Sequence, residues 1–343
     1  MEKYGQYRDK GSGIAPFFPI APPPSNLVLA PYHLLLFCLR IPLLIFAWAV
    51  WLLIIQWTTA GSLLRKANLW CILGIPGVWW IDIRVDGVQR GSLGKGGSMR
   101  LPGPGTIIAS SYTSPLDVLY LAAIFDPIFT QSYQGSRKVR PLSLEGALAA
   151  CFSLTTSPEQ TIELSQLVAQ NPQRVIVVFP ESTTSNGRGV LHLSPSLLSA
   201  PKSTSIYPVS LRYTPADVVT PIPGWMEALR FIWKLCSRQT HCIRVRVGLP
   251  MTLAQQHKAA EQEVGREASR GREPPKKYDT NFFDSFQSSE SDDAEGLKPA
   301  ERRSLDLIAE SLSRLGRAKT LGLGIEEKIG FVNAWMGKSK KRR

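Results

Sequence analysis

The chain has 343 residues, 44% of them hydrophobic, and 40 Lys+Arg against 27 Asp+Glu give it a formal net charge of +13. This length and apolar content exclude wholesale disorder and allow one large domain or two ordinary ones. The five scattered cysteines show no metal-ligand or CxxC spacing, which excludes a secreted disulfide scaffold, and the charge indicates an anionic partner: nucleic acid, a membrane surface or a phosphorylated substrate.

The N-terminal part divides into two segments. Residues 1–26 are polar and rich in Gly and Pro, which predicts a flexible arm. Residues 27–60 begin with an almost continuous apolar run to Trp57, typical of a membrane-embedded helix or hairpin. Arg40 and Pro42 leave two arrangements open. One is a single tilted span with Arg40 snorkelling to the interface, and the other is a re-entrant hairpin bent near these residues.

Residues 61–255 alternate between β-rich and helical segments, which predicts an α/β domain. We expect a mostly parallel central sheet flanked by helices, because several strand candidates are continuous apolar runs. The expected strands are Ile81–Val88, Thr106–Ser110, Arg174–Phe179, Ser205–Leu211 and Cys242–Val247, and the expected helices are Val118–Phe125 and Thr161–Gln170.

The C-terminal part changes character twice. Residues 256–303 mix charges of both signs, which predicts a disordered linker. Residues 304–343 combine an amphipathic helix with a basic tail, and one stripe of the helix either packs on the domain or lies on a membrane. That stripe consists of Leu305, Ile308, Leu312 and Leu315.

The tail carries Lys340 and Lys341 third and fourth from the end. This pair resembles the dilysine signal that returns membrane proteins to the endoplasmic reticulum. Alternatively, the tail contacts anionic lipid. Either interpretation places it on the cytosolic face.

Polar side chains follow two of the expected strands. Ser110–Asp117 joins a strand to a helix, and Phe179–Arg188 follows an apolar strand with a carboxylate, four Ser or Thr residues, a turn and an arginine. Ligands of parallel sheets bind outside the carboxyl ends of the strands. Hydroxyls, backbone N–H groups and a guanidinium in one loop can hold a phosphate, so we expect a site here. Asp117 by itself is more typical of a helix cap.

In their order and spacing these blocks resemble the glycerolipid acyltransferase family, which includes the 1-acylglycerol-3-phosphate acyltransferases. The family shows Asn-His-x-Ser-x-x-Asp, then Phe-Pro-Glu-Gly-Thr-Arg-Ser, then a strand bearing a proline. The resemblance covers residues 60–255, and fungal members of the endoplasmic reticulum and lipid droplets are the most similar. The matching residues are Thr113, Ser114 and Asp117, then Phe179, Pro180, Glu181, Thr183, Ser185 and Arg188, then Pro208.

The sequence departs from the family pattern at four positions. The family's catalytic histidine falls on Tyr112 and its asparagine on Ser111, while its glycine and arginine fall on Ser182 and Thr184. A phenol with a pKa near 10 is a poor base at neutral pH. Three alternatives follow: Tyr112 positions the acceptor, another base enters the site, or the domain binds lipid without turnover.

The resemblance implies a glycerolipid acyltransferase-like fold and transfer of an acyl group from acyl-CoA to the sn-2 hydroxyl of lysophosphatidate or another lysophospholipid. The product would be phosphatidic acid for phospholipid and triacylglycerol synthesis. Catalytic roles would fall to Asp117, Tyr112 and Ser114, with His192 or Asp117 as an alternative base. Substrate binding would fall to Thr113, Glu181, Ser182, Thr183, Thr184, Arg188 and Pro208.

The expected partners are acyl-CoA as co-substrate, the lysolipid and membrane lipids. We expect no cofactor and no metal. We also expect no nucleic acid, because no zinc, helix-turn-helix or RNA-recognition pattern occurs. The resemblance implies the membrane of the endoplasmic reticulum, with lipid droplets as a second location and the catalytic domain in the cytosol. The alternative function is that of a catalytically weak member of the fold that binds lysolipid or acts in lipid trafficking.

Overall fold

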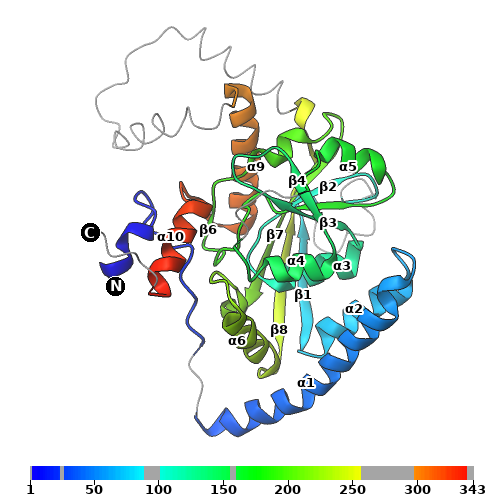
Figure 1. The fold of residues 1–343 in the computed structure, drawn as a ribbon, viewed down its shortest axis with the longest axis vertical. Coiled ribbons are helices and arrows are strands. Elements are labelled where there is room, and N and C mark those ends of the chain that lie inside the picture. Colours follow the sequence, from blue (N-terminus) through cyan, green and yellow to red (C-terminus); the bar gives the residue numbers. More distant parts are fainter. Residues whose placement is uncertain (1, 24–26, 89–100, 155–159, 256–296, 338–343) are drawn as a thin grey trace.

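A computed structural model describes residues 2–23, 27–88, 101–154, 160–255 and 297–337 (Figure 1). The linker expected at 256–303 falls outside the described residues up to 296, and so does the dilysine tail. The α-helices are α1 (Ala30–Leu53), α2 (Leu63–Gly74), α3 (Pro115–Phe125), α4 (Leu144–Ala150), α5 (Leu164–Gln170), α6 (Trp225–Cys236), α9 (Pro299–Gly316) and α10 (Ile325–Trp335).

One mixed sheet forms the centre of the molecule, with strands in the order β1-β8-β7-β2-β5-β3-β4 and β9 paired to β7. Its inner pairs β7–β2, β2–β5 and β5–β3 are parallel, as is β1–β8, whereas β7–β8, β3–β4 and β7–β9 are antiparallel. The expectation of a mostly parallel sheet is confirmed. The strands are β1 (Val78–Val85), β2 (Ile107–Ser110), β3 (Ile128–Ser132), β4 (Val139–Leu142), β5 (Ile176–Val178), β7 (Ser205–Thr214), β8 (His241–Val247) and β9 (Met251–Thr252).

Helices cover both faces of this sheet. Successive strand residues point to opposite faces, so Ile108 joins a core with α1, α2, α3, α4 and α6, whereas Ile107 joins one with α5 and α9. This two-sided cover explains why the inner strands read as continuous apolar runs. The first strand begins at Val78, three residues before the expected start.

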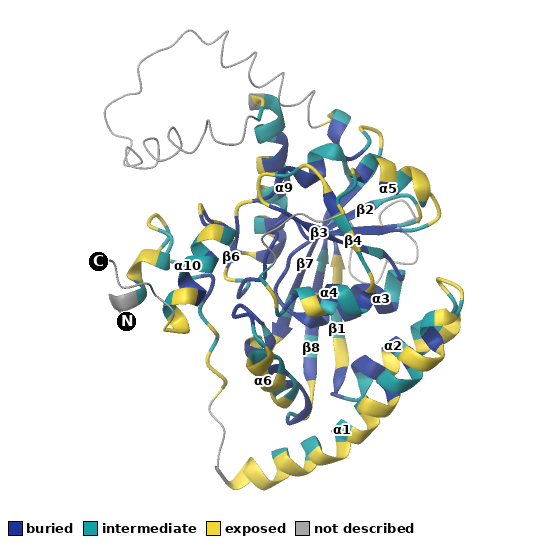
Figure 2. Cartoon of the chain, viewed as in Figure 1, coloured by how far each residue is buried: buried dark blue, intermediate teal, exposed yellow. Residues whose placement is uncertain are grey.

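The apolar N-terminal segment forms one continuous helix, α1, which passes through Pro42 without reversing. A hairpin bent near that residue is therefore excluded, and the chain turns back into α2 only after Trp57. Within the described residues, Ala30–Trp57 is the helix long and apolar enough to cross a membrane. Its outer face is largely exposed (Figure 2).

Arg40 contacts the α/β domain. Its guanidinium donates to the carbonyl oxygens of Cys236 (3.1 Å), Arg238 and Gln239 (2.9 Å), just beyond the end of α6. Carbonyls at the end of a helix lack partners inside that helix, so a cation is well placed at the C-terminus of α6. Farther along α1, Trp51 is buried and its indole N–H donates to Glu145 at 2.6 Å. These contacts join α1 to the α/β domain.

The amphipathic helix begins at Pro299, earlier than the expected Ser304. Its stripe of Leu305, Ile308, Leu312 and Leu315 is buried, and the first three belong to the core that contains Ile107. The alternative of a membrane-bound stripe is therefore wrong. The chain then pairs β10 (Lys319–Thr320) with β6 (Gly189–Val190) in a second, two-stranded sheet.

Residues 2–23, which we expected to form a flexible arm, pack against the domain and α10 instead. Phe17 is 1% exposed and joins a small core with Phe331 of α10. The amide side chain of Asn186 donates to the carbonyls of Ala15 (2.8 Å) and Phe18 (3.0 Å). The N-terminal arm and α10, which lie side by side in Figure 1, thus cover the loop after β5 together.

Candidate functional site

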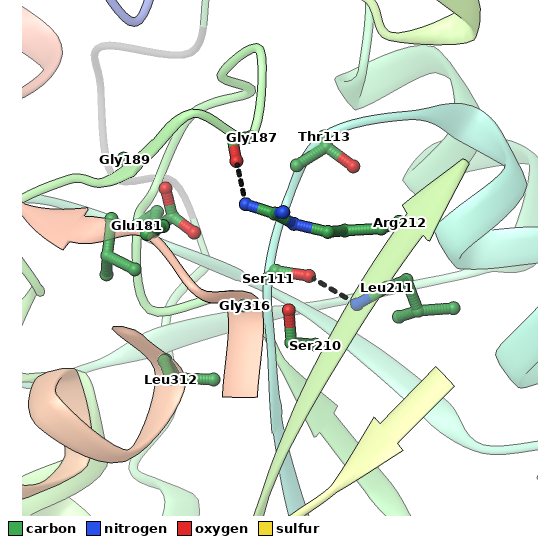
Figure 3. A pocket seen from close by; sticks show the side chains of 12 residues that line it. Ser111, Thr113, Glu181, Gly187, Gly189, Ser210, Leu211, Arg212, Leu312 and Gly316 are labelled. Carbon is green, nitrogen blue, oxygen red and sulfur yellow. Dashed lines mark hydrogen bonds between the residues drawn. The ribbon is translucent and has the colours of Figure 1, made fainter. Parts of the chain in front are cut away.

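The two polar blocks meet at the carboxyl ends of β2 and β5. Thr113, from the turn between β2 and α3, and Glu181, from the loop after β5, line one small pocket with Arg212 of β7 (Figure 3). The pocket has a volume of about 20 Å³, so the structure shows the site without room for an acyl chain. The other lining residues are Ser111, Gly187, Gly189, Val190, Ser210, Leu211, Leu312, Gly316 and Ala318.

Ser114 and Asp117 form the N-terminal cap of α3. The Ser114 hydroxyl accepts from the Leu116 N–H and donates to the Val218 carbonyl at 2.7 Å. Asp117 Oδ2 accepts from the N–H groups of Thr113 (2.7 Å) and Ser114 (2.9 Å) and from the Thr113 hydroxyl (3.0 Å). This reciprocal arrangement is a capping box. It fixes Thr113 in the pocket wall.

Asp117 is fully buried, and burial raises its pKa to about 6 despite these donors. Its second oxygen, Oδ1, accepts from the Tyr213 hydroxyl. All of these partners are held by the protein, and Asp117 does not line the pocket. Its link to the pocket wall is its pair of hydrogen bonds with Thr113.

Tyr112, at the family's histidine position, lies inside the core. Its ring stacks on Phe179 at a centroid distance of 4.4 Å. Burial raises the pKa of the phenol well above its usual range, and the nearby Cys151 thiol adds to the rise. Tyr112 is not among the residues that line the pocket, so this phenol is unsuited to take a proton there.

Glu181 is the carboxyl group that faces the pocket. Its Oε2 atom accepts from the Leu191 N–H at 3.3 Å and the Ser185 hydroxyl at 3.5 Å. Burial raises the pKa of Glu181 to about 8, and the nearby Asp117 carboxyl adds to the rise. A carboxyl group with this pKa can exchange a proton near neutral pH.

The loop that carries Glu181 is tightly held. Ser182 has φ 58°, in the left-handed region, which explains why a glycine suits this position. Its carbonyl accepts from the Gln131 side chain at 3.0 Å. Thr183 and Thr184 are buried, and the Thr184 hydroxyl donates to the Thr220 carbonyl at 2.7 Å. The loop conformation is thus fixed from several sides.

A buried lysine from α10 reaches this loop. Lys328 is 1% exposed, and its Nζ donates to the carbonyl oxygen of Thr184 at 2.7 Å and to its Oγ1 at 2.9 Å. Thr184 stands where the family has an arginine, so a distant helix brings a cation to that position. Burial lowers the pKa of Lys328 to about 7, while the Cys151 thiol and the Glu181 carboxyl counteract the fall.

Of the residues expected at the site, Thr113 and Glu181 line the pocket, and the others do not. Arg188 lies between two lining glycines but its own side chain is exposed. His192 is exposed, and its backbone N–H donates to the Leu323 carbonyl at 3.0 Å. Pro208 is buried in β7, opposite Ala109 of β2. No cluster of three metal-ligating side chains occurs among the described residues.

Sequence reasoning missed Arg212, Ser210 and Lys328. The first two lie in the same strand as Pro208, four and two residues after it, and their alternation with the apolar Val209 and Leu211 was the local signal. Lys328 lies 144 residues from its partner, and no short-range pattern reports such a contact.

Two curated proteins are similar to the chain. The "Putative lysophosphatidic acid:oleoyl-CoA acyltransferase" of Schizosaccharomyces pombe is 25% identical over an alignment of 354 residues, which covers 99% of each chain. Lysophosphatidic acid:oleoyl-CoA acyltransferase 1 of Saccharomyces cerevisiae is 28% identical over 198 residues, 57% of this chain and 61% of that protein. No family model matches. The two relatives confirm the resemblance carried by the sequence blocks, and with it the expectation that the chain is an acyltransferase.

Proposed function

We propose that this acyltransferase moves an acyl group from acyl-CoA to the sn-2 hydroxyl of lysophosphatidate and so forms phosphatidic acid for phospholipid and triacylglycerol synthesis. The observation that carries the proposal is the pocket shared by Thr113 and Glu181, one from each matched block. The names of the two yeast relatives support the choice of substrates. No cofactor is needed for this chemistry, because the thioester itself is the activated group.

The reaction needs a base that takes the acceptor's proton. We assign this role to Glu181. As the hydroxyl oxygen attacks the thioester carbonyl, a C–O bond forms, the proton moves to Glu181 and the carbonyl oxygen becomes an oxyanion. Arg212, whose guanidinium projects into the pocket in Figure 3, is placed to stabilise that charge. The oxyanion collapses, the C–S bond breaks, and the CoA thiolate leaves with the proton from Glu181.

Membrane association is part of the proposal. The long apolar α1 supports an anchored enzyme that takes its lysolipid from a membrane. We propose the endoplasmic reticulum as its location, with lipid droplets as a second one and the catalytic domain facing the cytosol. Membrane lipids are then partners of the outer face of α1, and nucleic acid is not a partner.

The test is acyl transfer by the full chain purified in detergent, with oleoyl-CoA and lysophosphatidate as substrates. Wild type and His192→Ala should be active, whereas Glu181→Gln should lose at least about 100-fold in kcat, the range for a removed general base. Tyr112→Phe should keep activity because the phenol does not reach the pocket. A wild-type chain that acylates no lysophospholipid would refute the proposed function.

A second candidate function has one observation in its favour. Tyr112 replaces the histidine on which the family depends and is buried against Phe179. A chain without turnover would bind lysolipid or act in lipid trafficking. Lysophosphatidate binding without acyl transfer, together with activity gained in Tyr112→His, would favour this alternative.

A further inference from the structure

Arginines gather on one face of β7, β8 and β1. In β8, Ile243, Val245 and Val247 enter the core, so the alternating Arg244 and Arg246 point to the opposite face. Their cross-strand partners on this face include Arg212 in β7 and Arg84 in β1. With Arg317, at the end of α9, they form the arginine row: Arg84, Arg212, Arg244, Arg246 and Arg317.

The row places like charges directly opposite each other. Arg212 faces Arg244 across β7 and β8, and Arg246 faces Arg84 across β8 and β1. Such pairs destabilise a sheet. Burial lowers the pKa of both Arg212 and Arg246, and the neighbouring arginines lower it further. Repulsion between these arginines therefore lowers the stability of the fold, and apolar packing alone gives no reason for placing them together.

Among the described residues, Asp82, which lies opposite Arg244 in the register of β1 and β8, is the acidic group that pairs with the row. Asp82 pairs with Arg246 at 3.4 Å and with Arg84 at 3.7 Å. Within the part of the chain that the structure describes, no carboxylate pairs with Arg212, Arg244 or Arg317. Buried Nη1 of Arg246 also lacks a hydrogen-bond partner among the described residues. Toward the described part of the chain, the row thus has unused capacity for anions.

The row is continuous with the pocket. Arg212 belongs to both, and its Nη2 donates to the Gly187 carbonyl at 3.3 Å on the far wall (Figure 3). Arg317 is held beside it, because the Arg317 carbonyl accepts from the same Nη2 at 3.5 Å. An anionic ligand that reaches Glu181 from this side would pass along the row.

We propose that the arginine row binds the phosphate groups of a substrate and so guides its reactive end to the Glu181 pocket. The identity of that substrate rests on the proposed function, which supplies two sources of phosphate: coenzyme A and lysophosphatidate. Guanidinium groups suit phosphate because they donate paired hydrogen bonds. The row extends over three strands, about 10 Å, which favours the pyrophosphate and 3′-phosphate of coenzyme A over the single phosphate of a lysolipid.

Steady-state kinetics of Arg244→Gln/Arg246→Gln test the proposal. The control is Lys138→Gln/Lys202→Gln, which removes the same charge from exposed positions outside the row. A rise in KM for oleoyl-CoA on the order of tenfold, as expected for lost charge-assisted hydrogen bonds, with kcat and the KM for lysophosphatidate unchanged, assigns the row to coenzyme A. The same rise in KM for lysophosphatidate alone assigns it to the lysolipid. Unchanged KM values for both substrates overturn the proposal.

Direct binding separates this proposal from the proposed function. Titration calorimetry with coenzyme A and with inorganic phosphate measures affinity without turnover. Binding that weakens in the double variant, but not in the control, supports the row even if the wild type transfers no acyl group. If the wild type is active but its affinity for both substrates does not depend on Arg244 and Arg246, the proposed function stands. The proposal that the arginine row binds phosphate is then refuted. Thermal unfolding of both variants checks that they fold.

Discussion

Asp117 and Glu181 are both buried carboxyls at the same edge of the sheet, but their surroundings give them different roles. Asp117 is surrounded by donors from its own helix cap and from Tyr213, so its geometry is structural. Glu181 has fewer donors and faces the pocket. We therefore place the proposed chemistry on the second block rather than on the position where the family has its histidine.

The pH dependence of acyl transfer tests this assignment. Because burial raises the pKa of Glu181 to about 8, its basic form is scarce at pH 6 and increases through pH 8. We expect kcat/KM to rise with pH and to level off above about pH 9. Initial rates between pH 6 and 9.5, with oleoyl-CoA and lysophosphatidate, measure the profile. A profile that is flat above about pH 7 would point to a base of lower pKa, such as Asp117, whose pKa is about 6.

Stability should respond to the same group in the opposite direction. The folded pKa of Glu181 lies above the usual value of 4.5, so the folded state binds more protons than the unfolded state between about pH 4.5 and 8. Its contribution to the free energy of unfolding is present below pH 4.5 and is lost as pH rises through 8. Glu181→Gln should therefore gain stability relative to wild type as pH rises over this range, as urea denaturation at pH 5 and 8 would show.

Ser182→Gly should stabilise the fold by about 0.5–1 kcal/mol, because a left-handed conformation strains every residue with a Cβ atom. The Ser182 hydroxyl is also buried and has no hydrogen-bond partner among the described residues. Ser185→Gly in the same loop is the matched control and should destabilise, since the Ser185 hydroxyl accepts from the Gly187 N–H. Urea denaturation of the three proteins compares them.

At the level of single residues, the sequence predicted two of the residues that line the pocket. Thr113 and Glu181 line the pocket, as a site at the carboxyl ends of two strands requires. The direction in which a side chain points is set by packing, however. Tyr112 turns into the core against Phe179 and Arg188 turns to solvent, and neither orientation follows from spacing along the chain.

Helices α9 and α10 complete the domain from the C-terminal side. The buried stripe of α9 closes one face of the sheet, and α10 delivers Lys328 to the Glu181 loop. The spacing of its apolar residues predicted the stripe. The same spacing could not show whether the stripe packs on a protein surface or on a membrane. Burial against the core that contains Ile107 decides between them.

Truncation of the α9 stripe tests this packing. Ile308 is fully buried, so Ile308→Ala should lower the free energy of unfolding by about 2–5 kcal/mol. Glu310→Ala, on the exposed side of the same helix, is the control and should stay within about 0.5 kcal/mol of wild type. Urea denaturation of the detergent-solubilised chain measures both. Equal stabilities would mean that α9 does not contribute to the core.

Lys328→Met should change how stability depends on pH. Because burial lowers the pKa of Lys328 to about 7 from 10.5, the unfolded state binds more protons than the folded state between these values. This group makes wild type more stable as pH rises above 7. The variant should lack that contribution, so urea denaturation should show its stability relative to wild type falling between pH 7 and pH 8.5. Lys202→Met, at an exposed position, should follow wild type.

Over the whole molecule, apolar surface is concentrated on the N-terminal helices. Phe46 and Leu53 of α1 are 69% and 76% exposed, although the opposite side of α1 is anchored by Trp51 and Arg40. Composition predicted a membrane segment, but it could not show that Arg40 binds the end of α6. That contact depends on residues 196–199 positions away along the chain.

Introducing negative charges on the exposed face of α1 should weaken the binding of the chain to membranes. Phe46→Glu/Leu53→Glu removes two exposed apolar side chains, each worth about 2 kcal/mol when buried in lipid, so vesicle affinity should fall by more than tenfold. Gln166→Glu/Gln170→Glu adds the same charge to the exposed side of α5 and should not alter binding. Co-sedimentation with phosphatidylcholine vesicles measures both. Equal pelleting of the two variants would contradict a membrane role for α1.

The contact between Lys328 and Thr184 also sets an order of events during synthesis. A ribosome that adds 5–20 residues per second needs roughly 7–30 seconds to make the 144 residues between them. The apolar α1 leaves the ribosome long before either residue. A nascent chain can therefore reach the membrane while its site still lacks α10, and a product that stops before Lys328 would be delivered without a finished loop.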